Sequence, residues 1–382
     1  MEFEPTPEQQ SLRAVVREFA EAEIAPHAER WDREHTFPLD VVLAMGELGL
    51  FGIPFPERYG GGGSDLATLC IAIEELARVD QSIAITLEAA VGLGANPVFR
   101  FGTEAQRERW LPDLCAGRAL GGFGLTEPDA GSDAGGTRTR AVLDERTGEW
   151  VIDGEKAFIT NSGTPITSIV TITARTAPEE ISAIVVPSGT PGLIVHPPYR
   201  KMGWHASDTH GLTLDGCRVP ADHLLGERGR GFANFLAVLD EGRVAIAALA
   251  LGVIEGCLAA ASDYARQRVA FGRAIGANQG VAFKIADLAV MADAARALTY
   301  RAAARRDAGR PFRREAAIAK LYATEAAVTA TREATQIFGG YGFMDDNPVA
   351  RQYRDAKILE IGEGTSEIQR LVIARDLGLP VA

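Results

Sequence analysis

A carboxylate flanked by glycines is the side chain in this sequence best placed to remove a proton from carbon. Glu363 lies between Gly362 and Gly364, after an apolar stretch and before a Thr-Ser pair that can cap a final helix. Such a turn can aim a carboxylate into a cavity, where desolvation raises its pKa toward useful basicity. Taken alone, the same pattern fits a surface glutamate better, so the rest of the chain must decide.

Two segments in the middle of the chain have the residue types that hold a flat ring. A glycine-rich segment from Gly121 to Asp133 can expose backbone N–H groups and let a large ligand approach the main chain, or it can be an ordinary interdomain connection. On the following strand, alternation places Phe158 and Thr160 on one face. An aromatic ring beside a hydroxyl suits the edge of a heterocycle, although an aromatic residue on a strand is more often part of the core.

Two helix ends nearer the C-terminus carry groups suited to a diphosphate. The segment from Arg266 to Arg273 holds three arginines, and clustered guanidinium groups bind pyrophosphate well. The alternative is a solvated helix end. The segment from Gln336 to Gly340 closes another helix with two glycines, which the usual preference for glycine at a C-cap also explains.

Charge and missing motifs argue against several other functions. The formal net charge is −12, so a nucleic-acid partner is not expected. The sequence contains no P-loop, Rossmann or nucleophile-elbow motif. His205 and His210 are the closest pair of histidines, and neither has a partner at metal-ligand spacing. No metal site is expected.

The cysteine pattern and the lack of a targeting or membrane-spanning segment predict a cytoplasmic protein. Its four cysteines are far apart and form no CxxC pair, which indicates free thiols in a reducing compartment. The N-terminus is acidic and lacks the basic and apolar regions of a signal peptide. The most hydrophobic uncharged run, from Val244 to Ile254, is too short to span a bilayer. No membrane partner is expected.

Three regions that differ in composition and hydrophobic periodicity must position these groups. Residues 1–120 are predicted to be helical, with capping boxes that begin at Thr6 and Thr103. Residues 121–226 carry short β-branched runs, and Asp-Gly pairs at 153–154 and 215–216 predict hairpin turns. Residues 227–382 are predicted to form long amphipathic helices. One expected buried face consists of Val281, Ile285, Leu288, Ala292, Ala295 and Thr299, and another of Ala317, Leu321, Thr324, Val328, Thr331, Thr335 and Phe338. The fold class is mostly α with a central antiparallel β domain.

Four segments carry a resemblance that covers essentially the whole chain. They are TEPDAGSD at 126–133, RVAFG at 268–272, QIFGGYGF at 336–343 and EGTSEIQR at 363–370. Together, in this order and spacing, they resemble the acyl-CoA dehydrogenase family. The resemblance implies an N-terminal helical domain at 1–120, a middle antiparallel β-barrel domain at 121–226 and a C-terminal four-helix bundle at 227–382. It also implies a homotetramer, with FAD in the cleft between the β domain and the bundle.

The resemblance assigns roles to individual residues, with Glu363 as the catalytic base. The residues that match the surroundings of the isoalloxazine are Phe123, Leu125, Thr126, Phe158 and Thr160. The residues that match contacts to the pyrophosphate and adenosine, some from across a subunit interface, are Arg268, Phe271, Gln279, Gln336, Gly339 and Gly340. Further FAD contacts match Thr365 and Glu367, and Ser132 is expected to serve both the cofactor and the CoA moiety. The expected substrate contacts are Arg243, Gly364 and Glu88, the last at a place resembling the pocket floor of medium-chain members.

The implied chemistry is the dehydrogenation of an acyl-CoA thioester to its trans-2,3-enoyl form. Glu363 takes the α-proton, the β-hydrogen leaves as hydride to flavin N5, and an electron-transferring flavoprotein reoxidises the flavin. The substrate is expected to be short- to medium-chain. Gly362 stands where the family commonly has tyrosine, so a branched chain is allowed; Phe158 stands where it often has tryptophan. The alternatives are a flavin oxidase or monooxygenase on the same fold, and a non-catalytic flavin-binding scaffold.

A second carboxylate competes for the role of the base. Some members of the family carry their base at the position of Gly242, and Glu241 stands one residue before it. One residue along a helix corresponds to about 100° around its axis. Glu241 would therefore point away from the direction that the family uses, which favours Glu363.

Overall fold

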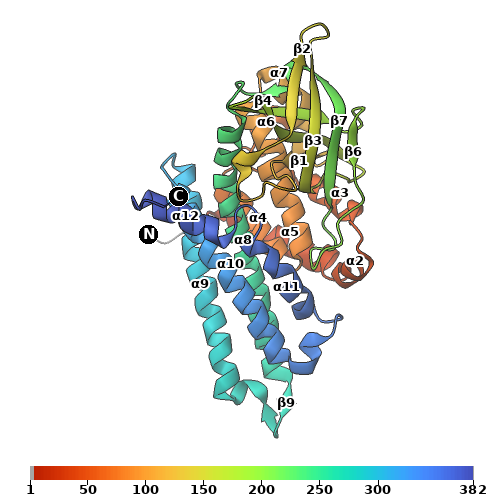
Figure 1. The fold of residues 1–382 in the computed structure, drawn as a ribbon. Coiled ribbons are helices and arrows are strands. Elements are labelled where there is room, and N and C mark those ends of the chain that lie inside the picture. Colours follow the sequence, from red (N-terminus) through yellow and green to blue (C-terminus); the bar gives the residue numbers. More distant parts are fainter. Residues whose placement is uncertain (1–3, 382) are drawn as a thin grey trace.

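The computed structural model describes residues 4–381, and a β domain lies between two helical regions of the chain (Figure 1). Both predicted capping boxes are present. The side chains of Thr6 and Thr103 each accept a hydrogen bond from the backbone N–H of the glutamine three residues later, and the side chain of that glutamine accepts one from the threonine backbone N–H. The helices of the N-terminal region are α1 (Pro7–Phe19), η1 (Ala20–Ile24), α2 (Ala28–Glu34), α3 (Leu39–Glu47), η2 (Leu50–Gly52), η3 (Glu57–Tyr59), α4 (Leu66–Ala77), α5 (Gln81–Glu88), η4 (Ala89–Ala95), α6 (Asn96–Phe101) and α7 (Glu104–Cys115).

The β domain is one eight-stranded sheet that stays open, so the expected antiparallel barrel is wrong. The strands are β1 (Leu120–Gly124), β2 (Arg140–Asp144), β3 (Glu149–Thr160), β4 (Thr167–Ala177), β5 (Glu180–Pro187), β6 (Leu193–Val195), β7 (Thr209–Pro220) and β8 (Leu224–Leu225). Their order is β6-β7-β3-β2-β4-β5-β8, with β1 on β4, and within residues 4–381 no pairing joins β6 to β8. The two edge strands, β6 and β8, are short. β1 and β2 run parallel to β4, an arrangement that is possible because long segments of chain connect each of them to β4.

The two Asp-Gly pairs do not form hairpin turns, and this prediction is also wrong. Gly154 lies inside β3 and Gly216 inside β7, where the register between these strands shifts. Gly154 has φ 150° and Gly216 has φ 57°, so both supply the backbone freedom that a β-bulge requires. The Gly216 N–H donates to Asp153 Oδ1 at 2.7 Å. The two pairs therefore bend one long antiparallel ribbon instead of reversing the chain.

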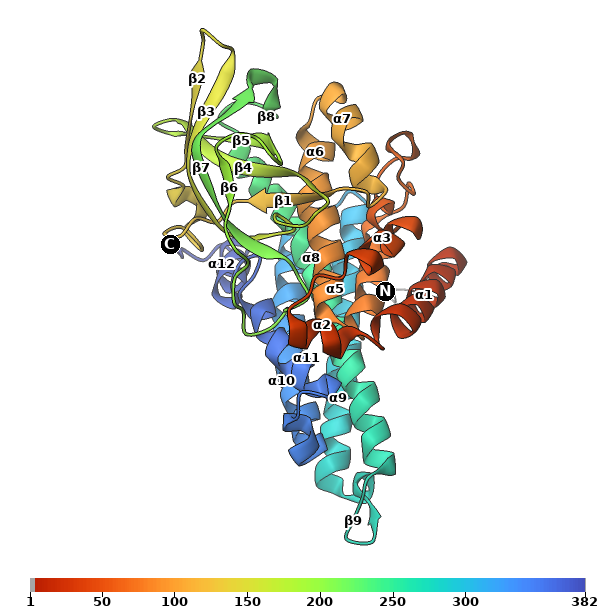
Figure 2. The same cartoon turned by 90° about the vertical axis from the view of Figure 1, so that its right-hand side faces the viewer.

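The C-terminal region is helical, as predicted, and the predicted faces are buried or half-buried. Its elements are α8 (Gly231–Gln267), β9 (Val269–Ala270), β10 (Arg273–Ala274), η7 (Ile275–Ala277), α9 (Gln279–Asp307), α10 (Arg313–Phe338), η8 (Gly339–Phe343), α11 (Pro348–Ala356), η9 (Lys357–Glu360) and α12 (Ser366–Asp376). The long helices α8, α9 and α10 pack together, and the short α11 and α12 pack on α10. The β9–β10 hairpin lies at the end of this bundle farthest from the β domain (Figures 1 and 2).

Two fully buried glutamates of α4 form an ion-pair network, and one of them, Glu74, links the N-terminal helices to the C-terminal ones. Arg13 Nη1 lies 2.9 Å from Glu74 Oε1 and 3.1 Å from Glu75 Oε1. Arg296 Nη1, on α9, lies 2.8 Å from Glu74 Oε1, and Arg17 Nε lies 2.8 Å from Glu75 Oε2. Removing one member of such a network would leave a buried charge unpaired. This network fixes α4, which packs along α8.

Two helical segments are long and apolar enough to cross a membrane by length and composition alone. They are Gln81–Phe101 and Gly231–Gln267. Most of each apolar stretch is buried inside the fold, at 83% and 72%. Core helices of this kind satisfy the same criterion, so the two segments are weak grounds for a membrane span.

Candidate active site

Glu363 lies on a tight turn that neighbouring side chains hold in place. Its backbone is left-handed, with φ 53°, and that of Gly364 is left-handed too, with φ 93°. Lys320 Nζ, from α10, donates to the Gly364 carbonyl at 2.7 Å, and Gln369 Nε2 donates to the same oxygen at 2.8 Å. Thr365 then caps α12 by accepting a hydrogen bond from the Ile368 N–H. A left-handed backbone at a non-glycine residue is unfavourable and concentrates at functional sites.

The Glu363 carboxyl group is buried although its residue is partly exposed. The backbone of the turn reaches the surface, but both carboxyl oxygens are shielded from water, and within residues 4–381 no amide, hydroxyl or cationic group donates a hydrogen bond to them. Burial raises the pKa of this carboxyl, while a hydrogen bond from Glu88 and the charges of Lys320 and Arg243 oppose the rise. A buried carboxyl of raised pKa is what a general base for a weakly acidic C–H requires.

The carboxyl group lies directly over Gly242 on α8. A methyl group placed on the Gly242 Cα would be 2.1 Å from Glu363 Oε2, so the two positions from which the family supplies its base converge on one place. Glu241 instead pairs with two arginines, at 3.1 Å to Arg100 Nη1 and 2.9 Å to Arg306 Nη2. These contacts leave Glu241 as a structural ion-pair partner.

A small cavity of about 30 Å³ is lined in part by Gly242, the residue over which this carboxyl lies. Its lining residues are Pro54, Phe55, Leu66, Leu69, Glu88, Val91, Gly92, Asn96, Phe99, Glu241, Gly242, Ala245 and Arg306. Most of the wall is apolar. Glu88 is fully buried, and neither of its carboxyl oxygens has a hydrogen-bond donor in the described chain. The structure thus brings Glu88, Gly242 and Glu363 together.

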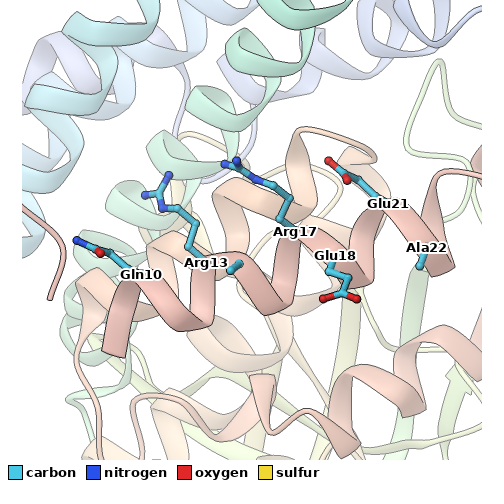
Figure 3. Close-up of a pocket in the computed structure, with 7 residues that line it drawn as sticks. Gln10, Arg13, Arg17, Glu18, Glu21 and Ala22 are labelled. Carbon is cyan, nitrogen blue, oxygen red and sulfur yellow. The ribbon is translucent and has the colours of Figure 1, made fainter. Parts of the chain in front are cut away.

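A second, larger hollow lies along α1 and η1 (Figure 3), and Glu363 is not among the residues that line it. Its volume is about 550 Å³, and it is open to solvent on one side of the helix. Two of its lining residues, Arg13 and Arg17, belong to the ion-pair network with Glu74 and Glu75. These contacts explain the arginines without a ligand, and nothing else at this hollow points to chemistry.

The glycine-rich segment near residue 121 has a packing role that sequence reasoning missed. Gly121, Gly122 and Gly124 lie in β1, which pairs with β4 and packs on the π-helix η4. A methyl group on Gly94 of η4 would lie 2.6 Å from the Gly121 carbonyl oxygen, and one on Gly124 would lie 2.8 Å from the side chain of Ile172. The glycines therefore allow η4 to approach the sheet; they do not form an exposed ligand-binding loop.

The segment that follows these glycines is fixed by a buried ion pair. Glu127 accepts hydrogen bonds from the Arg138 N–H at 2.6 Å and from Lys156 Nζ at 2.7 Å. Burial lowers the pKa of Lys156 to about 8, although Glu127 opposes that shift. The Thr126 carbonyl accepts from the Ala157 N–H at 2.9 Å. The pair thereby sets Thr126 beside β3, where the predicted ring contacts lie.

The predicted contacts to the flat ring occupy different environments. Phe158 is 65% exposed, has φ 63° and lies at a register shift in β3. Thr160 and Thr126 are half-buried and Leu125 is buried. Phe123 stacks on Phe235 of α8, with ring centroids 4.0 Å apart. A large aromatic side chain held outward on a strained backbone fits a surface meant to be covered, and these residues suit the isoalloxazine of FAD.

The predicted diphosphate contacts lie together at the opposite end of the bundle. These exposed residues are Arg268, Phe271, Gln279, Gln336, Gly339 and Gly340. Phe271 is 100% exposed with φ 52°, and Arg268 lies over the ring of Tyr341. The β9–β10 hairpin at this end is far from the β domain in both views (Figures 1 and 2). Within a single chain, the predicted diphosphate contacts therefore lie far from the predicted ring contact Phe158.

The remaining predicted residues are spread around the turn and the β domain. Ser132 and Glu367 are exposed. Arg243 is buried and donates to Asp240, so part of its charge is already neutralised. Sequence reasoning missed Lys320, which is fully buried three residues after Ala317 and four before Thr324. A lysine on that predicted apolar face was the signal that could have revealed it.

Two helical regions with a β domain between them in sequence, and a buried carboxyl group on a turn between the last helices, are the features that the comparisons with known proteins must explain. Three segments match the acyl-CoA dehydrogenase N-terminal, middle and C-terminal domains, at residues 6–118, 122–217 and 229–378. The chain belongs to the acyl-CoA dehydrogenase family, and FAD is its cofactor.

Individual proteins resemble the chain over nearly its whole length. It is 50% identical to a probable acyl-CoA dehydrogenase of Bacillus subtilis, over 99% of this chain and 100% of that one. The structure of butyryl-CoA dehydrogenase from Megasphaera elsdenii is similar with a TM-score of 0.96 and 42% identity, covering 99% and 100%. A structure described as the electron transferring flavoprotein of Acidaminococcus fermentans matches with a TM-score of 0.96 and 42% identity, covering 99% of each chain.

Proposed function

We propose that this protein converts a short-chain acyl-CoA thioester to its trans-2,3-enoyl form. The observation that carries the proposal is the buried carboxyl of Glu363, which lies over Gly242, a residue that lines a small, mostly apolar cavity. The similarity to a butyryl-CoA dehydrogenase supports the same chemistry and a short acyl group.

Glu363 is placed to take the α-proton of a thioester that binds over Gly242, with its acyl end toward that cavity. Its carboxylate gains the proton as the α-C–H bond breaks, and its own backbone N–H can donate to the thioester carbonyl, where negative charge develops. Lys320 and Gln369 hold the turn through Gly364, so the carboxylate need not reorganise. FAD, when bound, accepts the β-hydrogen as hydride.

The polarity of the cavity wall supports a short chain as the preferred acyl group. The buried Glu88 carboxyl is one of the groups that line the cavity, and each buried methylene is worth only about 0.8 kcal/mol. A medium-length chain would have to displace the wall or meet a polar group. We therefore expect butyryl-CoA to be dehydrogenated with a higher kcat/KM than octanoyl-CoA.

The proposal is tested by mixing the purified, FAD-loaded protein with butyryl-CoA without oxygen and following the flavin absorbance. We expect rapid bleaching that persists when air is admitted, and faster reoxidation by an electron-transferring flavoprotein, which we propose as the acceptor. Rapid reoxidation by oxygen would instead indicate a flavin oxidase or monooxygenase. Absence of bleaching across a panel of acyl-CoA thioesters would indicate a non-catalytic flavin-binding scaffold.

Gly362 should leave room for branched acyl groups beside the base. A methyl group on Gly362 would meet only the Ile358 carbonyl oxygen, at 3.5 Å, so a larger side chain can be accommodated without backbone strain. We predict that Gly362→Tyr lowers kcat/KM for isobutyryl-CoA about tenfold more than for butyryl-CoA, since filling a pocket costs roughly 1–3 kcal/mol. An unchanged ratio of the two kcat/KM values would contradict this role.

We further propose a homotetramer in which a neighbouring chain completes each FAD site. Several exposed apolar side chains belong to the same end of the bundle as the predicted diphosphate contacts, including Phe271, Phe283, Tyr341 and Phe343. Isolated soluble chains rarely leave such surfaces uncovered. Light scattering should give four chains per particle. Phe271→Asp should lower both the mass of the particle and the FAD content, whereas a monomer that retains FAD would overturn the proposal.

We also propose the domain boundaries, the cellular location and the contacts to the cofactor and substrate. We place the domain boundaries near residues 120 and 226 and the protein in the cytoplasm, where its four buried free cysteines would remain reduced. We assign the flavin, CoA and substrate contacts to the residues named above. Ser132, exposed on its loop, is the contact proposed for the CoA moiety.

A further inference from the structure

Two buried carboxyl groups face each other at the active site. Glu88 ends α5 and has no exposed surface; it lines the same small cavity as Gly242, over which the Glu363 carboxyl lies, and the two carboxyl groups are close enough to interact. None of the four oxygens receives a hydrogen bond from any other group in the described chain. Two ionised carboxylates at such a place would repel each other, so one of them must carry a proton.

The surrounding charges decide which carboxyl carries it. Burial, and then the charge of Glu363, raise the pKa of Glu88 well above its usual range. Glu363 has two cations nearby, Lys320 and Arg243, which oppose the effect of burial on its pKa. Among residues 4–381, no cation opposes the rise in the pKa of Glu88 in the same way. The proton therefore resides on Glu88 and the negative charge on Glu363.

Other titratable groups around the pair do not change this assignment. Glu241 of α8 and Arg306 of α9 line the same cavity, but they pair with each other at 2.9 Å. Asp240 pairs with Arg243. The thiol of Cys70, on α4, is neutral because burial raises its pKa well above the usual value.

We propose that Glu88 is a positioning residue for the catalytic base: as a neutral acid it donates a hydrogen bond to the Glu363 carboxylate in the substrate-free enzyme. The pair then binds one proton, and Glu363 is ionised and oriented before the thioester arrives. This inference rests on the proposed function. It differs from a role as the mere floor of the pocket, because a floor would restrict the acyl chain without moving any pH dependence.

Variants of Glu88 test the hydrogen bond through the pH profile of flavin reduction by butyryl-CoA. Loss of the donor in Glu88→Ala removes a contact that favours ionised Glu363, so the pKa of the base rises and the acid limb moves up by about one pH unit. Glu88→Gln still donates through its amide, so its acid limb should stay at the wild-type position. Glu255→Gln, which alters a partly buried carboxylate paired with Arg296, is the matched control and should not move it.

Infrared spectroscopy of the substrate-free protein tests the proton itself. At neutral pH, the wild-type protein should have one protonated-carboxyl C=O band more than Glu88→Gln, and Glu255→Gln should retain that band. An unchanged band in Glu88→Gln, or an acid limb that moves equally or not at all in Glu88→Ala and Glu88→Gln, would overturn the inference. If no acyl-CoA reduces the wild-type flavin, the proposed function fails, and the infrared difference still decides whether Glu88 holds the proton.

Discussion

Replacing Glu363 by glutamine is expected to slow flavin reduction by acyl-CoA at least about 10⁴-fold, the upper end of what a positioned general base contributes. The amide has nearly the same shape as the carboxyl but cannot accept the α-proton, and elimination cannot begin without proton loss. The left-handed turn, the Lys320 bond to the Gly364 carbonyl and the cap at Thr365 do not involve the carboxyl. The variant should therefore fold, keep FAD and bind butyryl-CoA. Anaerobic stopped-flow absorbance measures the rate.

The informative control is Glu241→Gln, which alters the other carboxylate of this region. Glu241 lies between Arg100 and Arg306, so its loss should affect the packing of α6 and α9 against α8 more than the chemistry. We expect the rate to change by less than about tenfold, close to 1.4 kcal/mol in the barrier. If Glu241→Gln is the inactive variant and Glu363→Gln still bleaches, the base is misassigned, although membership of the family stands.

Local features of the fold were predictable because they depend on residues close together in sequence. The capping boxes at Thr6 and Thr103 need only a four-residue pattern, and both are present. The buried faces of α9 and α10 follow from helical periodicity, which also placed Thr299 and Thr331 correctly. The glycines on both sides of Glu363 drew attention to that residue, but its expected role as the base came from the resemblance of residues 363–370 to the family.

Features that depend on tertiary contact were missed or misinterpreted. The glycine-rich segment from residue 121 to 133 had two interpretations, and neither included the packing of Gly94 of η4 against Gly121, which requires a residue without a side chain there. Gly154 was predicted to form a turn, whereas its partner strand β7 converts it into a bulge. Glu88 and Glu363 are 275 positions apart in the printed sequence. Their proximity depends on how α5 and the turn before α12 meet across α8. No local pattern encodes that arrangement.

Gly242→Ala is expected to slow flavin reduction about 10²-fold, the cost of misplacing a catalytic group by roughly 1 Å. The added methyl group would lie 2.1 Å from Glu363 Oε2, well inside contact distance, so the carboxylate must move. The clash involves the flexible end of a side chain, so the fold can absorb it. The free energy of unfolding should change little, while the rate falls and FAD content stays at the wild-type level.

Gly252→Ala, ten positions further along α8, separates this effect from crowding of the helix. Its methyl group would lie 2.2 Å from the backbone carbonyl oxygen of Glu74, which cannot move without shifting α4. Overpacking of that kind costs about 1–3 kcal/mol of stability, but it leaves the base and the cavity beside it intact. Thermal unfolding and stopped-flow reduction should therefore respond oppositely in the two variants: Gly252→Ala loses stability and keeps its rate per folded, FAD-loaded chain, and Gly242→Ala does the reverse. Equal rates for Gly242→Ala and the wild type would mean that the Glu363 carboxylate does not occupy the space over Gly242 during the reaction. The convergence of the family's two base positions at this place would then have no catalytic meaning here.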